Sequence, residues 1–196
     1  SVAGLILDLR DDPGGLRWVA EDLLDLFVSN GTIFSAEGRR GKVRSHSASS
    51  FSTRLEGLPI VVLVNSSSAS ASEIVAGTLQ AVGGAVVVGE RTHGKGSVQT
   101  VRTLFNNGYA FVTESWFTVP DGRGGRRLID RYRAGEQWGI EPNLPVGATM
   151  TETMAIMSER GRWHSGRGLD APRPEDLAPT LATTNDRELL LAVALL

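Results

Sequence analysis

Cysteine is absent from the 196 residues, and histidine and lysine are scarce. Without cysteine the chain cannot form a disulfide, bind a metal through thiolates or use a cysteine nucleophile. Long hydrophobic runs are also missing, since the apolar stretch "PIVVLV" at 59–64 is far shorter than the roughly 20 residues of a membrane-spanning helix. The sequence therefore excludes thiol chemistry and predicts no integral membrane segment.

A surplus of positive charge is missing too. The 20 Lys and Arg residues are opposed by 22 Asp and Glu, which leaves a net charge of −2 at pH 7. This balance argues against nucleic acid or an acidic membrane surface as the main partner. His46 and His164 lie far apart without acidic neighbours, so no metal site and no cofactor are predicted. The length and a hydrophobic content of 41% fit one globular domain with a full core.

The order of apolar segments predicts an α/β fold. Short, continuous apolar strands are expected at 4–9, 59–65 and 85–89, with helical spacing between them. Apolar residues that run on without alternation are typical of a mostly parallel sheet with both faces buried. A hairpin is expected at 32–46 and a longer strand at 108–119.

The pattern changes at about residue 149, so we expect a core unit at 1–149 and a carboxy-terminal helical and irregular segment at 150–196 that completes it. A helix rich in methionine begins this segment, and a helix from Asp186 to Leu196 ends it. The stretch 160–179 between them is rich in Gly, Pro and Arg and is predicted to be irregular.

A serine cluster, "SSSASAS" at 66–72, follows the second buried strand and precedes a helix. Ser70 is placed to cap that helix, because Glu73 three residues later completes a capping box. The same position suits a nucleophile, since a helix N-terminus offers free N–H groups, here that of Ala71, to a developing oxyanion. The stretch alone leaves both interpretations open.

The glycine-flanked lysine in "GERTHGKGSVQ" at 89–99 is the second candidate. Lys95 is one of only two lysines, and a lysine can lose its proton to act as a general base, whereas an arginine cannot. An exposed loop lysine is the ordinary alternative. A phosphate-binding loop is another, with Asp8 as its magnesium carboxylate, but Gly96 stands where that motif needs Ser or Thr, and 97–101 alternates like a strand.

Four segments, "GLILDLRDDPGG", "VVLVNSSSASASEIVAGTLQ", "VVVGERTHGKGSVQT" and "WGIEPN", together resemble the carboxy-terminal processing (tail-specific) proteases of the S41 type. The resemblance spans residues 4 to about 146. It implies a core shared with crotonase and Clp-type proteases, built from stacked strand–helix units. It also implies that Ser70 is the nucleophile, that Lys95 takes its proton and that Gln99 orients the lysine. The implied oxyanion hole consists of the backbone N–H groups of Gly15 and Ala71.

The resemblance implies an acyl-enzyme mechanism without metal or nucleotide, acting on the carboxy-terminal tails of protein or peptide substrates. It further implies an exported location, in the periplasm, cell envelope or thylakoid lumen. The sequence leaves open whether the chain forms a homo-oligomer. The PDZ domain and the amino-terminal part of the core found in such proteases are not in this sequence. We therefore expect the chain to be a fragment of a longer precursor, with a shortened relative whose substrate delivery differs as the alternative.

Three features differ from the family pattern. His93 replaces the usual Phe before G-K-G; we expect an exposed loop histidine, with a Ser–His arrangement as the alternative. Ala81 stands where an aspartate is common. Residues 120–143 are longer and richer in arginine than usual and are expected to form a solvated charged loop. A catalytically silent binding or scaffold module with the same fold is the rival function.

Overall fold

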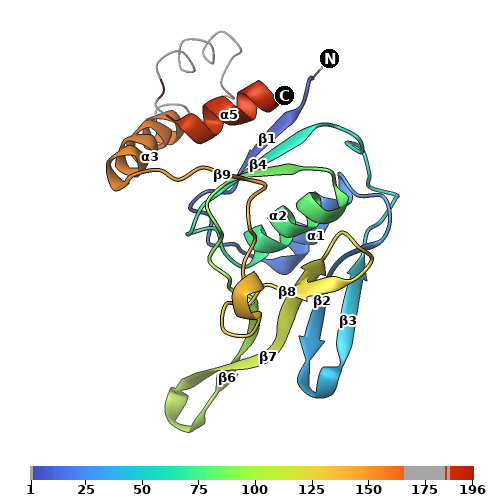
Figure 1. The fold of residues 1–196 in the computed structure, drawn as a ribbon. Coiled ribbons are helices and arrows are strands. Elements are labelled where there is room, and N and C mark those ends of the chain that lie inside the picture. Colours follow the sequence, from blue (N-terminus) through green and yellow to red (C-terminus); the bar gives the residue numbers. More distant parts are fainter. Residues whose placement is uncertain (1, 166–183, 185) are drawn as a thin grey trace.

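The computed structural model describes residues 2–165, 184 and 186–196. Its central layer is a sheet of four parallel strands in the order β1-β4-β5-β9 (Figure 1). The strands are β1 (Leu5–Asp8), β4 (Ile60–Val64), β5 (Val86–Gly89) and β9 (Leu144–Pro145). The predicted mostly parallel central sheet is therefore confirmed.

A second, antiparallel sheet lies on the other side of two helices. Its strands follow the order β3-β2-β7-β6, with β8 added on β7. They are β2 (Thr32–Gly38), β3 (Val43–Ser47), β6 (Ser97–Thr103), β7 (Tyr109–Pro120) and β8 (Arg126–Leu128). The expected hairpin and long strand both belong to this sheet, and β6 and β7 extend from the body as a long hairpin (Figure 1).

Helices α1 (Arg17–Asp25) and α2 (Ala71–Val82) lie between the two sheets, whereas α3 (Met150–Ser165) and α5 (Arg187–Leu195) lie on the opposite side of the parallel sheet (Figure 1). Three short 3-10 turns, η1 (Arg39–Gly41), η2 (Phe105–Asn107) and η3 (Gly135–Gln137), interrupt the connections. No helix in the described part of the chain is long and apolar enough to cross a membrane.

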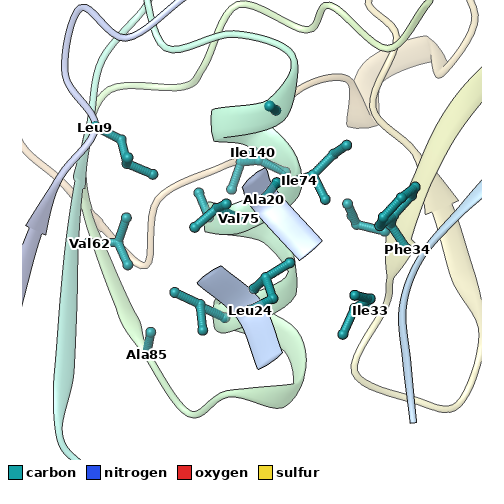
Figure 2. Close-up of a cluster of buried hydrophobic side chains, with 14 of the residues drawn as sticks. Leu9, Ala20, Leu24, Ile33, Phe34, Val62, Ile74, Val75, Ala85 and Ile140 are labelled. Atoms are coloured by element: carbon teal, nitrogen blue, oxygen red, sulfur yellow. The ribbon is translucent and has the colours of Figure 1, made fainter. Parts of the chain in front are cut away.

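Both faces of the parallel sheet are buried. Val62 and Val87 face the core that α1 and α2 share with the antiparallel sheet, and Figure 2 shows Ile74 of α2 within this core. Their neighbours Leu63 and Val88 face Ala192 of α5. Because alternate side chains of β4 enter one of two cores, every position of that strand is apolar. This explains the continuous hydrophobic runs in the sequence.

The expectation of a solvated charged loop at 120–143 holds for the exposed residues 121–126 and 131–133 but is wrong for other parts of that segment. Strand β8 pairs with β7, and Ile129 and Ile140 are completely buried. Ile140 packs against α2 at Gly77, where a Cβ atom would meet the Ile140 Cδ1 at 2.7 Å. The charged residues around these two isoleucines obscured their burial in the sequence.

Candidate active site

Ser70 lies immediately before the first residue of α2, at the point where the serine cluster meets the helix. Its backbone has φ 57° and ψ −115°, an unusual conformation for a residue with a side chain. Such backbone geometry costs of order 1–3 kcal/mol and persists only where surrounding contacts enforce it. Ser70 is half-buried, and Ala71, which follows it, is buried at the start of the helix.

The contact that enforces this geometry comes from Glu73, which is completely buried. Its Oε2 atom accepts hydrogen bonds from the backbone N–H of Ser70 and from that of Lys95, each at 2.8 Å. Its Oε1 atom accepts from the Thr92 hydroxyl at 2.5 Å and from the Gly94 N–H at 2.6 Å. One carboxylate therefore fixes the backbone of both sequence-predicted catalytic residues.

Glycines on both sides of Lys95 bring the loop against its neighbours. Gly94 has φ +78°, and a Cβ atom there would lie 2.8 Å from Trp138, while one on Gly96 would lie 2.7 Å from the backbone nitrogen of Asp130. The predicted close approach of the backbone is therefore confirmed. The Lys95 side chain itself is exposed. This exposure agrees with the ordinary alternative of an exposed loop lysine, because the glycines, not the lysine, make the buried contacts.

The turn after β1 lies against the same helix start. The carbonyl of Asp12 accepts the N–H of Ala69 at 3.0 Å. Gly14, with φ +86°, would place a Cβ atom 2.5 Å from the Ala69 carbonyl and 2.7 Å from the Ala71 nitrogen. Gly15 follows in the chain and has open space where its Cβ would be. The two backbone segments that the resemblance assigns to an oxyanion hole are thus neighbours.

Other predicted contacts are not formed. In the part of the chain that the structure describes, no hydrogen bond joins the Ser70 hydroxyl to the Lys95 amine. Gln99 on β6 is exposed, and its amide donates at 3.5 Å to Thr113, not to Lys95. His93 is also exposed, and its backbone N–H donates to the Ser68 carbonyl at 2.9 Å.

A buried ionic cluster adjoins the turn. Arg10 is 4% exposed and pairs with Asp8, Asp186 and Glu188 at 2.7–2.8 Å. Burial by itself lowers the pKa of Arg10, but the hydrogen bonds and charges of Asp8 and Asp186 raise it above its usual value. Burial raises the pKa of the Glu188 carboxyl despite its contact with Arg10. This arginine stays charged in the interior.

The nucleotide-binding alternative finds no support in this geometry. Oxygens of Glu73 accept the N–H groups of Gly94 and Lys95, which a phosphate-binding loop would direct at phosphate. The chain then continues into strand β6 instead of a helix. Among the described residues, no group of three His, Asp or Glu side chains is arranged to hold a metal ion.

Sequence reasoning treated Glu73 only as part of a helix cap and did not include it in the site. A usable signal was present, because Glu73 is the one charged residue of α2, a helix that is otherwise apolar or small and polar. A charged residue with no solvent-facing side needs buried partners, and here those partners are backbone donors. Arg10 in "DLRDDPGG" was also left out of the predicted site, because its need for buried partners was likewise not considered.

Comparison with known families identifies the chain. The model of the family described as Peptidase family S41 matches residues 1–146, about three quarters of the chain. The chain belongs to peptidase family S41. The match contains the Ser70 and Lys95 segments together with the turn after β1, so the site described above lies within the family region.

The curated relatives have closely related names. A carboxy-terminal-processing protease of Bartonella bacilliformis is 42% identical over 153 residues, which cover 76% of this chain and 32% of that protein. A carboxyl-terminal-processing protease of Picosynechococcus is 39% identical over 155 residues, 74% of this chain and 33% of that protein. The chain thus spans about a third of the length of these relatives.

Solved structures agree on the fold. A photosystem II D1 C-terminal processing protease is 32% identical with a TM-score of 0.65, over 74% of this chain and 35% of that one. A lipoprotein from Streptococcus agalactiae is 19% identical with a TM-score of 0.59, over 82% of this chain and 56% of that one, and shows the fold alone.

Proposed function

We propose that the protein is a serine endopeptidase that cleaves protein substrates near their carboxy-termini, with Ser70 as nucleophile and Lys95 as general base. One observation carries the proposal: a single oxygen of the buried Glu73 accepts the backbone N–H of both residues, at 2.8 Å each. The names of the relatives, carboxy-terminal processing proteases, support the substrate class.

In the proposed reaction, the neutral amine of Lys95 takes the proton of the Ser70 hydroxyl while its oxygen attacks the peptide carbonyl carbon. The peptide C–N bond then breaks, Lys95 returns the proton to the leaving amine, and an ester joins the substrate acyl group to Ser70. A water molecule, deprotonated by Lys95, hydrolyses that ester and restores the Ser70 hydroxyl. Gln99 is proposed to orient Lys95 once substrate is bound, because catalytic hydrogen bonds are often long in unliganded sites.

The negative charge of the tetrahedral intermediate needs preorganised donors. We infer that the N–H groups of Gly15 and Ala71 supply them. This assignment is supported by the packing of Gly14 against Ser70 and Ala71, and by the position of Ala71 at the N-terminus of α2, where helical N–H groups have no internal acceptor.

The test is covalent labelling of the full-length protein with a fluorophosphonate, read out by intact mass. We expect one adduct, located on Ser70, and none in Ser70→Ala. Both proteins should unfold at the same urea concentration, which excludes misfolding as the cause. A folded protein that takes up no label would instead support the scaffold alternative, in which the family fold binds other proteins without cutting them.

A further inference from the structure

The carboxy-terminal segment lies outside the region that matches the family, yet it contacts the turn that leads to Gly15. In Figure 1, α3 and α5 lie beside the end of β1, on the side of the parallel sheet away from α2. The contacts are made by charged side chains. They converge on residues 8–11, a few residues before the Pro-Gly-Gly turn.

Two carboxylates of this segment hold Arg10. Its Nη1 atom donates to Asp186 Oδ1 at 2.8 Å and to Glu188 Oε2 at 2.7 Å. All three residues are at most 5% exposed. Asp186 also caps α5, because the same Oδ1 atom accepts the Leu189 N–H at 3.0 Å. The N-terminus of α5 and the arginine therefore share one acceptor.

A third contact comes from α3. Arg160 donates to the Asp11 carboxylate at 3.0 Å and to the backbone carbonyl of Arg10 at 3.1 Å. Asp11 has φ +60°, a conformation that a residue with a side chain seldom adopts. Asn65 at the end of β4 also bonds Asp11, through both its amide and its carbonyl. The segment thus contributes to holding a strained backbone.

The chain continues from Asp11 to a contact with Ser70 within a few residues. Asp12 follows Asp11 and accepts the N–H of Ala69 through its carbonyl at 3.0 Å, while its carboxylate accepts the Gly14 N–H at 2.9 Å. Gly14 in turn packs directly on Ser70. A shift of Arg10 would therefore move both Gly15 and the residue before Ser70.

We propose that Asp186 and Glu188 are positioning residues for catalysis, which hold the oxyanion-donating turn against Ser70 through Arg10. This inference rests on the proposed function, because it assumes that Gly15 donates to the oxyanion. It adds a role for a segment that the family match does not include. A displacement of order 1 Å at such a turn is enough to slow chemistry about 100-fold.

The experiment measures fluorophosphonate labelling in the full-length protein, since phosphonylation also places a developing oxyanion in the site. We compare wild type with Asp186→Asn, Glu188→Gln and the double variant. Asparagine can still cap α5, and glutamine keeps the shape of the glutamate. We expect the maximal labelling rate, kinact, to fall about 10-fold in each single variant and further in the double one, with KI unchanged.

Ala192→Gly is the matched control, because Ala192 is completely buried in the same helix but belongs to the apolar cluster with Val61 and Leu63 and has no polar side chain to pair with Arg10. It weakens α5 without touching the ionic cluster, so its kinact should stay at the wild-type value. Urea unfolding gives the free energy of unfolding of each variant, so that the changes in kinact can be compared with the changes in stability.

Equal kinact in wild type and in the folded single variants overturns the inference. The inference is also overturned if the kinact of Ala192→Gly falls as much as that of the single variants when their losses of stability are equal. Should the double variant fail to fold, the two single variants still decide. Failure of the proposed function is a separate result, because the wild-type protein itself would then take up no label.

Discussion

Ser70 and Lys95, 25 positions apart in sequence, donate their backbone N–H groups to the same oxygen of one buried carboxylate, each at 2.8 Å. This shared acceptor holds the two loops together without a hydrogen bond between the two side chains in the described structure. A carboxylate that accepts four hydrogen bonds is well compensated for its burial. The loops are therefore held in place before any substrate arrives.

Replacing Glu73 with glutamine should uncouple the two loops. The amide keeps one acceptor oxygen but directs an NH2 group at donors, so backbone N–H groups lose their partners. We expect a loss of about 3 kcal/mol in the free energy of unfolding and labelling of Ser70 slowed by at least 10-fold. Thr78→Val is the control: its buried hydroxyl donates to the Ile33 carbonyl from the same helix. Similar labelling rates in both variants would contradict the role of Glu73.

Lys95→Arg should abolish hydrolysis while leaving the fold intact. Arginine retains the positive charge but cannot give up its proton, so the general-base contribution of about 10²–10⁴ in rate is lost. The side chain is exposed, and the stability should change by less than about 0.5 kcal/mol. Lys42→Arg, at the only other lysine, should behave as wild type. A peptide-cleavage assay with urea unfolding checks both statements, and turnover retained in Lys95→Arg removes the base assignment.

Gln99→Ala tests the weaker of the sequence assignments. Within the described part of the chain the Gln99 amide has one side-chain hydrogen bond, to Thr113 at 3.5 Å, so its loss should not affect stability. We expect the cleavage rate to fall about 10-fold or less, because an orienting group contributes less than the base itself. We would measure kcat and KM for one peptide in Gln99→Ala and, as a control, in Thr113→Val. A Gln99→Ala variant as inactive as Lys95→Arg would assign the glutamine a direct part in the chemistry.

Alanine substitutions at the two adjacent glycines of the turn should have different effects on stability and labelling. Gly14→Ala would place a methyl group 2.5–2.9 Å from the Ala69–Ala71 backbone and Ser70, in a φ region that side chains disfavour. We expect a cost of about 2 kcal/mol or more and strongly slowed labelling. Gly15→Ala meets no atom within 4 Å and keeps its N–H group, so it should label normally. A slow Gly15→Ala variant that is fully stable would indicate that substrate fills that space.

Acid should destabilise the protein partly through Asp8. Burial works to raise the pKa of this carboxyl, but hydrogen bonds and charge from Arg10 hold it below its usual 3.8. A group with a depressed pKa stabilises the fold above its usual value, and that stability is lost as the pH falls through the depressed pKa. Asp8→Asn should thus cost about 1 kcal/mol at pH 7, and the difference from wild type should shrink as the pH falls below 3.8 and through the depressed pKa. Urea titrations at several pH values measure this.

The pKa of Glu188 is shifted in the opposite direction to that of Asp8, so Glu188→Gln should affect stability at pH 7 differently. Burial raises the pKa of Glu188 above its usual 4.5, so the folded state disfavours its ionised form at neutral pH. Glutamine removes that ionisation cost, and we expect little or no loss of stability at pH 7. A loss larger than that of Asp8→Asn would contradict this expectation. Arg10→Met is the harsher change, since it leaves buried carboxylates unpaired and should cost about 3–5 kcal/mol.

Much of the fold followed from local patterns. Continuous apolar runs at 59–65 and 85–89 predicted parallel strands because such strands are buried on both faces. The capping pair Ser70 and Glu73 located the start of α2, and the glycines beside Lys95 predicted a close backbone approach. Burial of Ile129 and Ile140 in an arginine-rich segment could not be predicted, because it depends on which surface the segment packs against.

The sequence by itself determined which groups are chemically able to act: it has no thiol, two lysines, one serine at a helix start and a Pro-Gly-Gly turn. These follow from residue type and short-range spacing. Only the tertiary structure decided that Glu73 joins two loops, that Lys95 lies exposed, and that Asp186 and Glu188 reach Arg10 from the far end of the chain. Hydrogen bonds and ion pairs act over about 3 Å, and the separation of their partners along the chain carries no information about that distance until the chain has folded.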